Sequence, residues 1–250
     1  MVSVGEHPAA GPSTGVRGLK NIIHWLPAPF RYFLTLLTFW PTALLSRLYC
    51  KLFPHRRRVW DRIDPAVILG AAPFFRSEIE SLQRLERVAG VVNMCREWNA
   101  HGDSFYPSVH ISQLWLPTID FDMPTLRDCV AGANFMKAHA DRGASVYIHC
   151  KAGRGRSTGV AVAFLVLHRG MSPQAAHEHI KARRPHISER HNTAEIQMCW
   201  ALRQQLDSGE KDATEYAQML TRVAAGVAPG GDAAAVTTRP PQPQRRRALA

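Results

Sequence analysis

The chain has 250 residues, of which 46% are hydrophobic, and a formal net charge of +11. That length suits one domain of ordinary size with tails, and the five scattered cysteines, with no Cys-x-x-Cys pair, argue against a disulfide framework and a zinc site. A basic chain could bind nucleic acid, but this one carries no nucleic-acid motif and no basic stripe interleaved with aromatic residues. We therefore expect an anionic membrane or an acidic substrate as the partner, no nucleic acid, and no metal or other cofactor. The sequence indicates no oligomeric state.

Residues 1–58 form a basic segment that becomes strongly apolar from Pro29 to Phe53. The uncharged stretch between Arg31 and Arg47 is shorter than the roughly 20 residues that span a bilayer, and it contains Pro41. We expect an interfacial helix or tilted anchor on an anionic membrane, the alternative being an amphipathic helix packed on the domain surface. The acid-poor flank resembles an organellar targeting segment, which favours a membrane of a mitochondrion or plastid over the cytoplasmic face of another membrane.

The pattern from residue 59 to 207 alternates between strands and helices. It predicts strands at 67–70, 90–94, 109–116 and 144–149, and helices at 77–88, 125–143, 157–168, 173–183 and 193–206. Such alternation predicts a three-layer α/β domain with a central mixed, mostly parallel sheet flanked by helices and a site beyond the strand ends. Residues 208–225 are predicted as a short helical extension, and 226–250 as a disordered tail rich in Pro, Ala and Arg.

The loop between the strand at 144–149 and the next helix contains several residues that could take part in catalysis. It reads His149-Cys150-Lys151-Ala152-Gly153-Arg154-Gly155-Arg156-Ser157. A cysteine attacks only as thiolate, and a helix N-terminus and nearby cations lower its pKa. The two glycines permit unusual backbone angles that let successive amides face one anion. The arginine at 156 can hold two phosphate oxygens, and the serine at 157 can hydrogen-bond the sulfur. For a lone cysteine, a buried strand end before a solvated basic turn would be the better interpretation.

This spacing of His-Cys, five residues, Arg and Ser resembles the protein tyrosine and dual-specificity phosphatase superfamily. The resemblance implies a cysteine-phosphatase domain with Cys150 as nucleophile. It implies that Arg156 is catalytic and that residues 151–156 bind phosphate, namely Lys151, Ala152, Gly153, Arg154, Gly155 and Arg156. His149 and Ser157 are expected to support the loop, His149 by orienting it through its ring nitrogens.

Ester cleavage also needs an acid for the leaving oxygen. Asp120 follows a predicted strand and precedes a helix, and Asp122 is the competing candidate. Either carboxylate could instead cap a helix or be solvated. We favour Asp120 because the acid of dual-specificity phosphatases lies directly after this strand.

Further stretches resemble the phosphatidylglycerophosphate phosphatase branch of that superfamily, the mitochondrial type. They are Arg62-Ile63-Asp64, Gly90-Val91-Val92-Asn93-Met94, Pro117-Thr118-Ile119-Asp120 and Arg184-Pro185-His186-Ile187. One departure is 95–99, which keeps a single carboxylate where that branch has an acidic stretch. The resemblance implies a metal-independent phosphomonoester hydrolase with a cysteinyl-phosphate intermediate. Its substrate would be phosphatidylglycerophosphate, with a phosphoinositide or a phosphoprotein as the alternative.

The loop also carries more positive charge than one phosphomonoester requires. Lys151 and Arg154 accompany Arg156, and a second phosphate on the substrate would explain the surplus. The alternative is that extra cations accelerate the capture of any anion. A phosphate-binding module without catalysis is a further hypothesis, against which the intact Cys150 and Arg156 count.

Overall fold

The computed structural model describes residues 26–99, 101 and 104–227 of the chain. Residues 1–25 and 228–250, which include nearly all of the predicted tail, lie outside the described residues. The elements are α2 (Ala28–Leu52), β1 (Trp60–Asp64), β2 (Val67–Ala71), α3 (Arg76–Glu86), β3 (Val88–Cys95), α4 (Phe105–Ser108), β4 (Ser112–Thr118), α5 (Leu126–Ala140), β5 (Ser145–Cys150), α6 (Arg156–Arg169), α7 (Pro173–Arg183), α8 (Ala194–Asp207) and α9 (Ala213–Ala224).

The strands form one sheet in the order β1-β2-β5-β3-β4. Strand β1 is antiparallel to β2, whereas β2, β5, β3 and β4 run parallel. The central strand β5 is buried along its whole length, which suits its apolar sequence. The carboxyl ends of the parallel strands meet at one edge, where β5 delivers Cys150 and β4 delivers Thr118. This edge is where an open α/β sheet binds its ligands.

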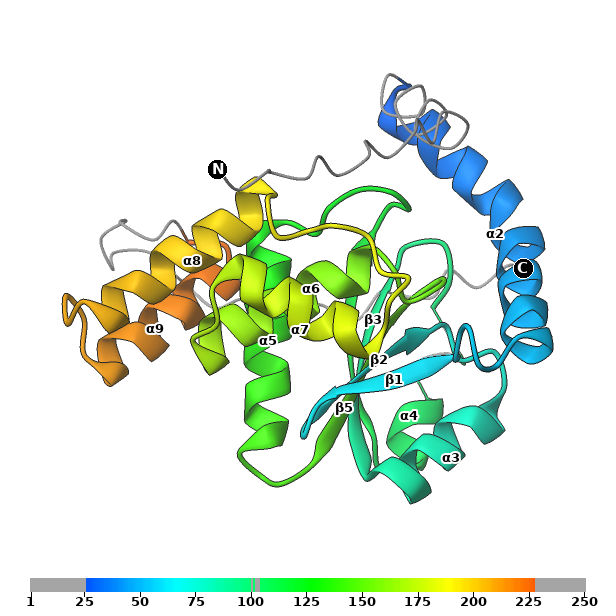
Figure 1. Cartoon of the computed structure of the whole chain (residues 1–250), viewed down its shortest axis with the longest axis horizontal. Helices are drawn as coiled ribbons and strands as arrows, with labels where there is room; N and C mark the ends of the chain where they lie inside the picture. The colour runs from blue at the N-terminus through cyan, green and yellow to red at the C-terminus, as the bar shows by residue number, and fades with distance from the viewer. Residues whose placement is uncertain (1–25, 100, 102–103, 228–250) are drawn as a thin grey trace, which may run out of the picture.

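Helices cover both faces of the sheet (Figure 1). The larger core lies between the sheet and helices α5 to α9, and α6 is buried from Arg156 to Leu167. The smaller core lies on the other face, where Ile79 and Leu82 of α3 contact the sheet. The predicted three-layer architecture with a mixed, mostly parallel sheet is confirmed.

Three local predictions differ from the structure. Helix α3 ends at Glu86 because Arg87 adopts a left-handed backbone (φ 55°), so Val88 opens β3 instead of ending the helix. The strand predicted at 109–116 begins only at Ser112, since the short helix α4 precedes it. Strand β1 was not predicted because its buried positions include charged residues. Asp64 is compensated by the distant Arg169, and Asp61 by the distant Arg184 as well as by the nearby Arg58.

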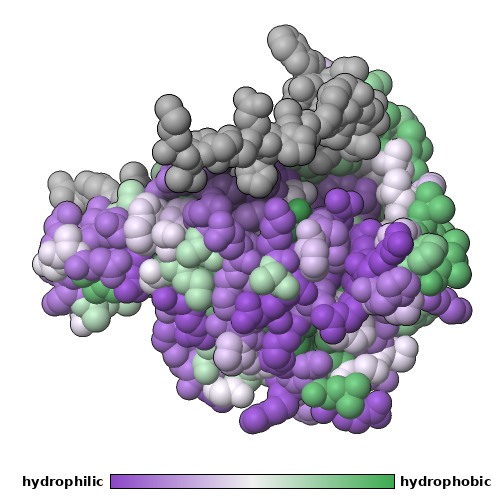
Figure 2. Space-filling model, viewed as in Figure 1, coloured by the Kyte–Doolittle hydropathy of each residue, from purple (hydrophilic) through white to green (hydrophobic). Residues whose placement is uncertain are grey.

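Helix α2 packs on the domain through a narrow face. Phe39 is 2% exposed and lies between Phe74 and Trp98, and Ala43 is also buried. The remaining surface is apolar as well, with exposed Phe30, Phe33, Leu36, Leu37, Trp40, Leu44, Leu45, Leu48, Tyr49 and Leu52. Figure 2 shows this apolar surface along the edge formed by α2. The helix is therefore packed on the domain but is not amphipathic.

Among the described residues, no helix combines the length and the apolar character needed to cross a bilayer. At the other end of the fold, α9 is continuous with the main core. Tyr216, Met219, Leu220 and Val223 of α9 are buried in that core. Thus residues 213–224 pack together with the helices that precede residue 207.

The packing of α2 gives a stability prediction. Phe39→Ala should lower the free energy of unfolding by about 3 kcal/mol, because it removes a buried aromatic ring. Leu37→Ala on the exposed face is the matched control and should change it by less than about 0.5 kcal/mol. Urea titration measures both values. Equal effects of the two substitutions would show that α2 is not docked in solution.

Candidate active site

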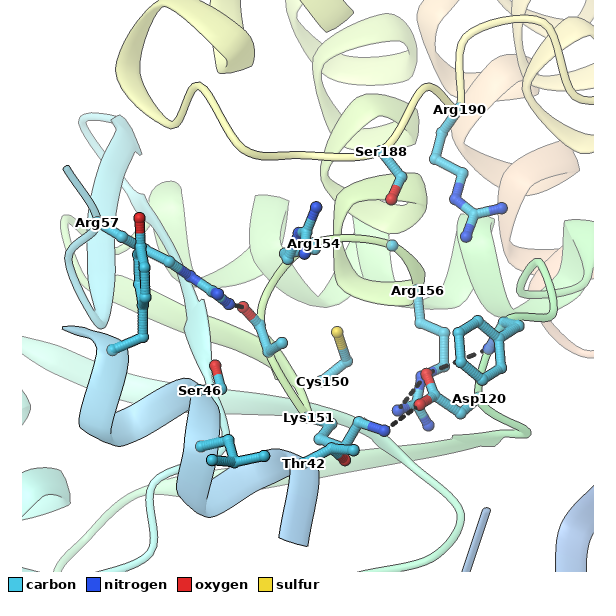
Figure 3. Close-up of a pocket in the computed structure, with 15 residues that line it drawn as sticks. Thr42, Ser46, Arg57, Asp120, Cys150, Lys151, Arg154, Arg156, Ser188 and Arg190 are labelled. Atoms are coloured by element: carbon cyan, nitrogen blue, oxygen red, sulfur yellow. Dashed lines mark hydrogen bonds and ion pairs between the residues drawn. The ribbon is translucent and has the colours of Figure 1, made fainter. Parts of the chain in front are cut away.

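A pocket of about 520 Å³ lies at the carboxyl edge of the sheet. Its floor is the loop after β5, with Cys150 at the start of the loop and Arg156 at its end. Asp120 lines one side, and Ser46 of α2 lies on another (Figure 3). The structure thus brings together the predicted nucleophile, arginine and acid.

The carbonyl groups of loop residues 151–155 all accept hydrogen bonds from other parts of the protein. The carbonyl oxygens of Lys151, Arg154 and Gly155 accept hydrogen bonds from the backbone N–H groups of residues 72, 188 and 159. Those of Ala152 and Gly153 accept from the buried Arg184 guanidinium. Because successive carbonyls point outward, the peptide N–H groups between them face the pocket. This arrangement is the concave nest of amides that binds an anion.

Arg184 anchors this loop, a role that its neighbours in the sequence do not indicate. Its side chain is fully buried and forms an ion pair with Asp61 of β1, 2.6 Å from Nη1 to Oδ2. The same guanidinium donates to the carbonyls of Ala152 and Gly153. The sequence marks this position by the Arg184-Pro185 pair after α7. The hydrogen-bond partners of Arg184, however, lie more than 30 residues away along the chain.

The two loop glycines differ in what they contribute. Gly153 has φ +64°, and a Cβ there would meet the backbone of Gly70 at 2.4 Å. Gly155 has φ −120°, outside the left-handed region, and a Cβ there would meet the end of the flexible Arg190 side chain. Unusual backbone angles were expected at both glycines, but of the two only Gly153 lies in the left-handed region.

Cys150 lies where its thiolate is stabilised. Burial alone would raise its pKa, but the Arg156 charge and hydrogen bonds from the side chain and backbone of Ser157 outweigh burial and lower the pKa to about 7. The Ser157 hydroxyl donates to the sulfur at 3.2 Å. By contrast, burial raises the pKa of Cys95, Cys129 and Cys199. The thiol with enhanced reactivity is therefore Cys150.

Arg156 is fixed from behind by Glu97. The two side chains form a bidentate pair, with 2.8 Å for each nitrogen–oxygen contact, and each is 1% exposed. The Thr118 carbonyl accepts a further hydrogen bond from Nη1 at 2.8 Å, whereas Nε is buried without a partner in the described structure. One edge of the guanidinium is thus held, and the other faces the pocket. Glu97 is the carboxylate that the altered 95–99 stretch retains.

Asp120 faces the loop and is ion-paired to it. Its carboxylate lies 2.5 Å from Lys151 Nζ and 3.1 Å from Arg156 Nη2 (Figure 3). Burial alone would raise the pKa of Asp120, but the positive charges of Arg156 and Lys151 hold it below its ordinary value. Asp122, the competing acid, instead contacts Arg31 of α2. Without a ligand, Asp120 is therefore an ionised carboxylate.

His149 supports the loop by packing. Both ring nitrogens are buried, and neither meets the geometric criteria for a hydrogen bond among the described residues, so their orienting role stays a prediction. The ring stacks on Tyr147, with 5.7 Å between centroids, and meets Trp98 edge-on. Burial lowers the pKa of His149 to about 3, so the ring is neutral.

Two arginines that the sequence did not single out complete the pocket. Arg57 follows α2, and Arg190 precedes α8. Both lie far along the chain from the loop, so only the folded arrangement reveals them.

Comparison with known proteins assigns the chain to a family. The model of the dual specificity phosphatase catalytic domain matches residues 74–200. The chain belongs to the dual specificity phosphatase family. It is 36% identical over 164 residues to phosphatidylglycerophosphatase and protein-tyrosine phosphatase 1 of Rattus norvegicus, which covers 63% of this chain and 84% of that protein. The predicted membership is thus confirmed.

Other dual specificity phosphatases extend this likeness. Phosphatidylglycerophosphate phosphatase PTPMT2 of Arabidopsis thaliana is 36% identical over 151 residues, covering 60% of this chain and 65% of that protein. The chain therefore spans less than two thirds of this relative. The crystal structure of PTPMT1 in complex with PI(5)P has a TM-score of 0.55 and 29% identity, and covers 61% of this chain and 99% of that one.

The thiolate environment yields a pH prediction. Alkylation of native protein by iodoacetate should accelerate as pH rises through about 7, because the Cys150 thiol ionises there. Ser157→Ala removes a hydrogen bond to the thiolate and should move this midpoint up by roughly one pH unit. Mass spectrometry locates the modified residue. Unchanged labelling in Cys150→Ser, or a midpoint near 9 in the native protein, would contradict the assignment.

Proposed function

We propose that this chain hydrolyses the phosphomonoester of a phospholipid such as phosphatidylglycerophosphate through a cysteinyl-phosphate intermediate. The observation that carries the proposal is that one pocket is bounded by both the Cys150 loop and the apolar helix α2. The relatives from Arabidopsis thaliana and Rattus norvegicus are both named as phosphatidylglycerophosphate phosphatases, the second also as a protein-tyrosine phosphatase, which supports the same substrate class.

The first chemical step forms a bond from Cys150 Sγ to phosphorus while the bond from phosphorus to the leaving alcohol oxygen breaks. The inward amides of residues 152–156 and the free edge of Arg156 bind the three equatorial oxygens. Asp120 gives its proton to the leaving oxygen. Water then attacks the cysteinyl phosphate, Asp120 takes the water proton, and phosphate and the Cys150 thiolate are released. In this scheme the loop amides and Arg156 stabilise the negative charge on the equatorial oxygens, and Asp120 neutralises the charge that develops on the leaving oxygen.

Asp120 can act as an acid only after substrate binds. In the free pocket its carboxylate is held ionised by Lys151 and Arg156. A bound phosphate takes over the free edge of Arg156 and places negative charge beside Asp120. Both changes raise the Asp120 pKa and favour uptake of a proton. The same ligand that needs the acid therefore brings about its protonation.

The surroundings of the pocket suit a substrate embedded in a lipid surface. Leu45 and Tyr49 of α2 line the pocket and are also exposed, so the pocket wall continues into the outer apolar surface. Exposed apolar surface of this extent marks an interaction site, and basic residues such as Lys51 and Arg56 border it. We propose that α2 rests on an anionic membrane, and that this membrane is organellar, of a mitochondrion or plastid.

A protein tyrosine or phosphoinositide phosphatase is the second candidate. The complex of PTPMT1 with PI(5)P favours the phosphoinositide within this alternative. The decisive experiment compares phosphate release by the full chain from phosphatidylglycerophosphate in anionic vesicles, from PI(5)P in the same vesicles, and from a phosphotyrosine peptide. We expect the highest kcat/KM for the first. Preference for the peptide would overturn the lipid assignment, and no release from any of them, nor from an aryl phosphate, would overturn the phosphatase.

The acid assignment gives a pH prediction. A general acid must be protonated, so kcat for an alkyl phosphate should fall as pH rises through the acid's pKa in the complex. Asp120→Ala should remove this alkaline decline and lower kcat by roughly 10²-fold or more. An aryl phosphate, whose leaving group needs less protonation, should be affected much less. Asp122→Ala is the matched control on the same loop, and the assignment is wrong if it gives the Asp120 phenotype instead.

A further inference from the structure

The surplus positive charge of the pocket agrees only in part with the prediction from the sequence, which placed it on Lys151 and Arg154. Lys151 is compensated by Asp120, and Arg156 by Glu97. Arg154 and Arg57 line the same pocket, and neither has a carboxylate at ion-pairing distance among the described residues. Arg190, on the α8 side of the pocket (Figure 3), likewise has no carboxylate at ion-pairing distance among the described residues, so Arg57 and Arg154 are two of three uncompensated arginines there.

Hydrogen bonds to carbonyl groups hold these two arginines at the pocket edge. Arg57 Nη2 donates to the Ala152 carbonyl at 3.4 Å, and Arg154 Nε donates to the His186 carbonyl at 2.7 Å. The Nε of Arg57 is buried and has no acceptor in the described structure. Figure 3 shows the Arg57 side chain pointing toward the loop and the Arg154 side chain at the top of the loop. Donor groups on both guanidiniums are left for a ligand.

The two guanidiniums repel each other. Burial is the main cause of the lowered pKa of Arg57, and the nearby positive charge of Arg154 lowers it further. Like charges close together in a partly buried site are unfavourable unless an anion lies near both. An anionic group bound between Arg57 and Arg154 removes this cost, so the arrangement favours anion binding.

A hydroxyl group on α2 adds an uncharged donor. The threonines of this helix, Thr35, Thr38 and Thr42, each donate to a backbone carbonyl three or four residues earlier. Ser46 lies on the same helix and lines the pocket, yet its Oγ is buried without a hydrogen-bond partner in the described structure. A buried hydroxyl that lacks a partner is costly and is rare in native proteins. A ligand oxygen would satisfy it.

From these observations we propose a second anion-binding site, formed by Arg57, Arg154 and Ser46, that takes the phosphodiester of the substrate. The site rests on the proposed function, since it binds a second group of the molecule whose phosphomonoester meets Cys150. A phosphodiester has two non-bridging oxygens, which suit a guanidinium and a hydroxyl. Its glycerol and acyl chains then continue along Leu45 and the exposed surface of α2.

The test measures binding separately from turnover. Cys150→Ser protein is titrated calorimetrically with glycerophosphoglycerophosphate, which carries a monoester and a diester, and with glycerol 3-phosphate, which carries the monoester alone. We expect the first ligand to bind at least about tenfold more tightly, because it adds charge-assisted hydrogen bonds. Adding Arg57→Gln should remove most of this preference, and adding Ser46→Ala should remove part of it.

The control is Arg84→Gln, which makes the same charge change on the exposed surface of α3 and should keep the preference. Thermal unfolding verifies that each variant is folded. Equal dissociation constants for the two ligands, or a preference that survives Arg57→Gln, would overturn the second site. Failure of the proposed function is distinguishable, because it shows as absence of phosphate release by the Cys150 protein, not as a change in these binding constants.

Discussion

The outward hydrogen bonding of the loop carbonyls is the constraint on which the site depends. Five successive carbonyls, those of residues 151–155, are engaged by three backbone amides and by Arg184. A flexible loop would leave its peptide dipoles free to turn toward water, and aligning them at each turnover would cost free energy. Here the alignment is fixed by the fold. The buried pair of Arg184 and Asp61 ties it to β1, the strand at the edge of the sheet.

A second consequence of the fold is that charges at the site are matched in pairs that have different roles. Glu97 is buried with Arg156 and keeps the guanidinium oriented without reaching the pocket. Asp120 is paired on the pocket side, where a phosphate would displace it. In the proposed mechanism, Glu97 stays paired with Arg156, whereas Asp120 leaves its ion pairs and takes up a proton. The two carboxylates beside Arg156 can therefore have different roles in the site.

The sequence predicted features whose residues are contiguous and left out those that meet only in space. The loop from His149 to Ser157 could be interpreted directly, because strand, glycines and helix follow one another. The roles of Arg184 and Arg57 could not be predicted, since their partners lie far along the chain. An arginine on a solvated surface can have the same neighbours in sequence as one that is buried in the fold. The β1 strand was missed for the same reason: Asp61 and Asp64 look exposed until Arg184 and Arg169 are placed beside them.

Helix α2 lies outside residues 74–200, the part that matches the family model, yet it supplies one wall of the pocket. Two of the three groups proposed to bind the phosphodiester, Ser46 and Arg57, are therefore encoded apart from the groups proposed to carry the bond-breaking chemistry. Under this proposal, changes in the stretch for residues 28–58 can alter which molecules bind beside Cys150 without changing the sequence of the loop. A chimera that exchanges this stretch between relatives would then transfer part of the selectivity, and this separation gives evolution a route to new substrates.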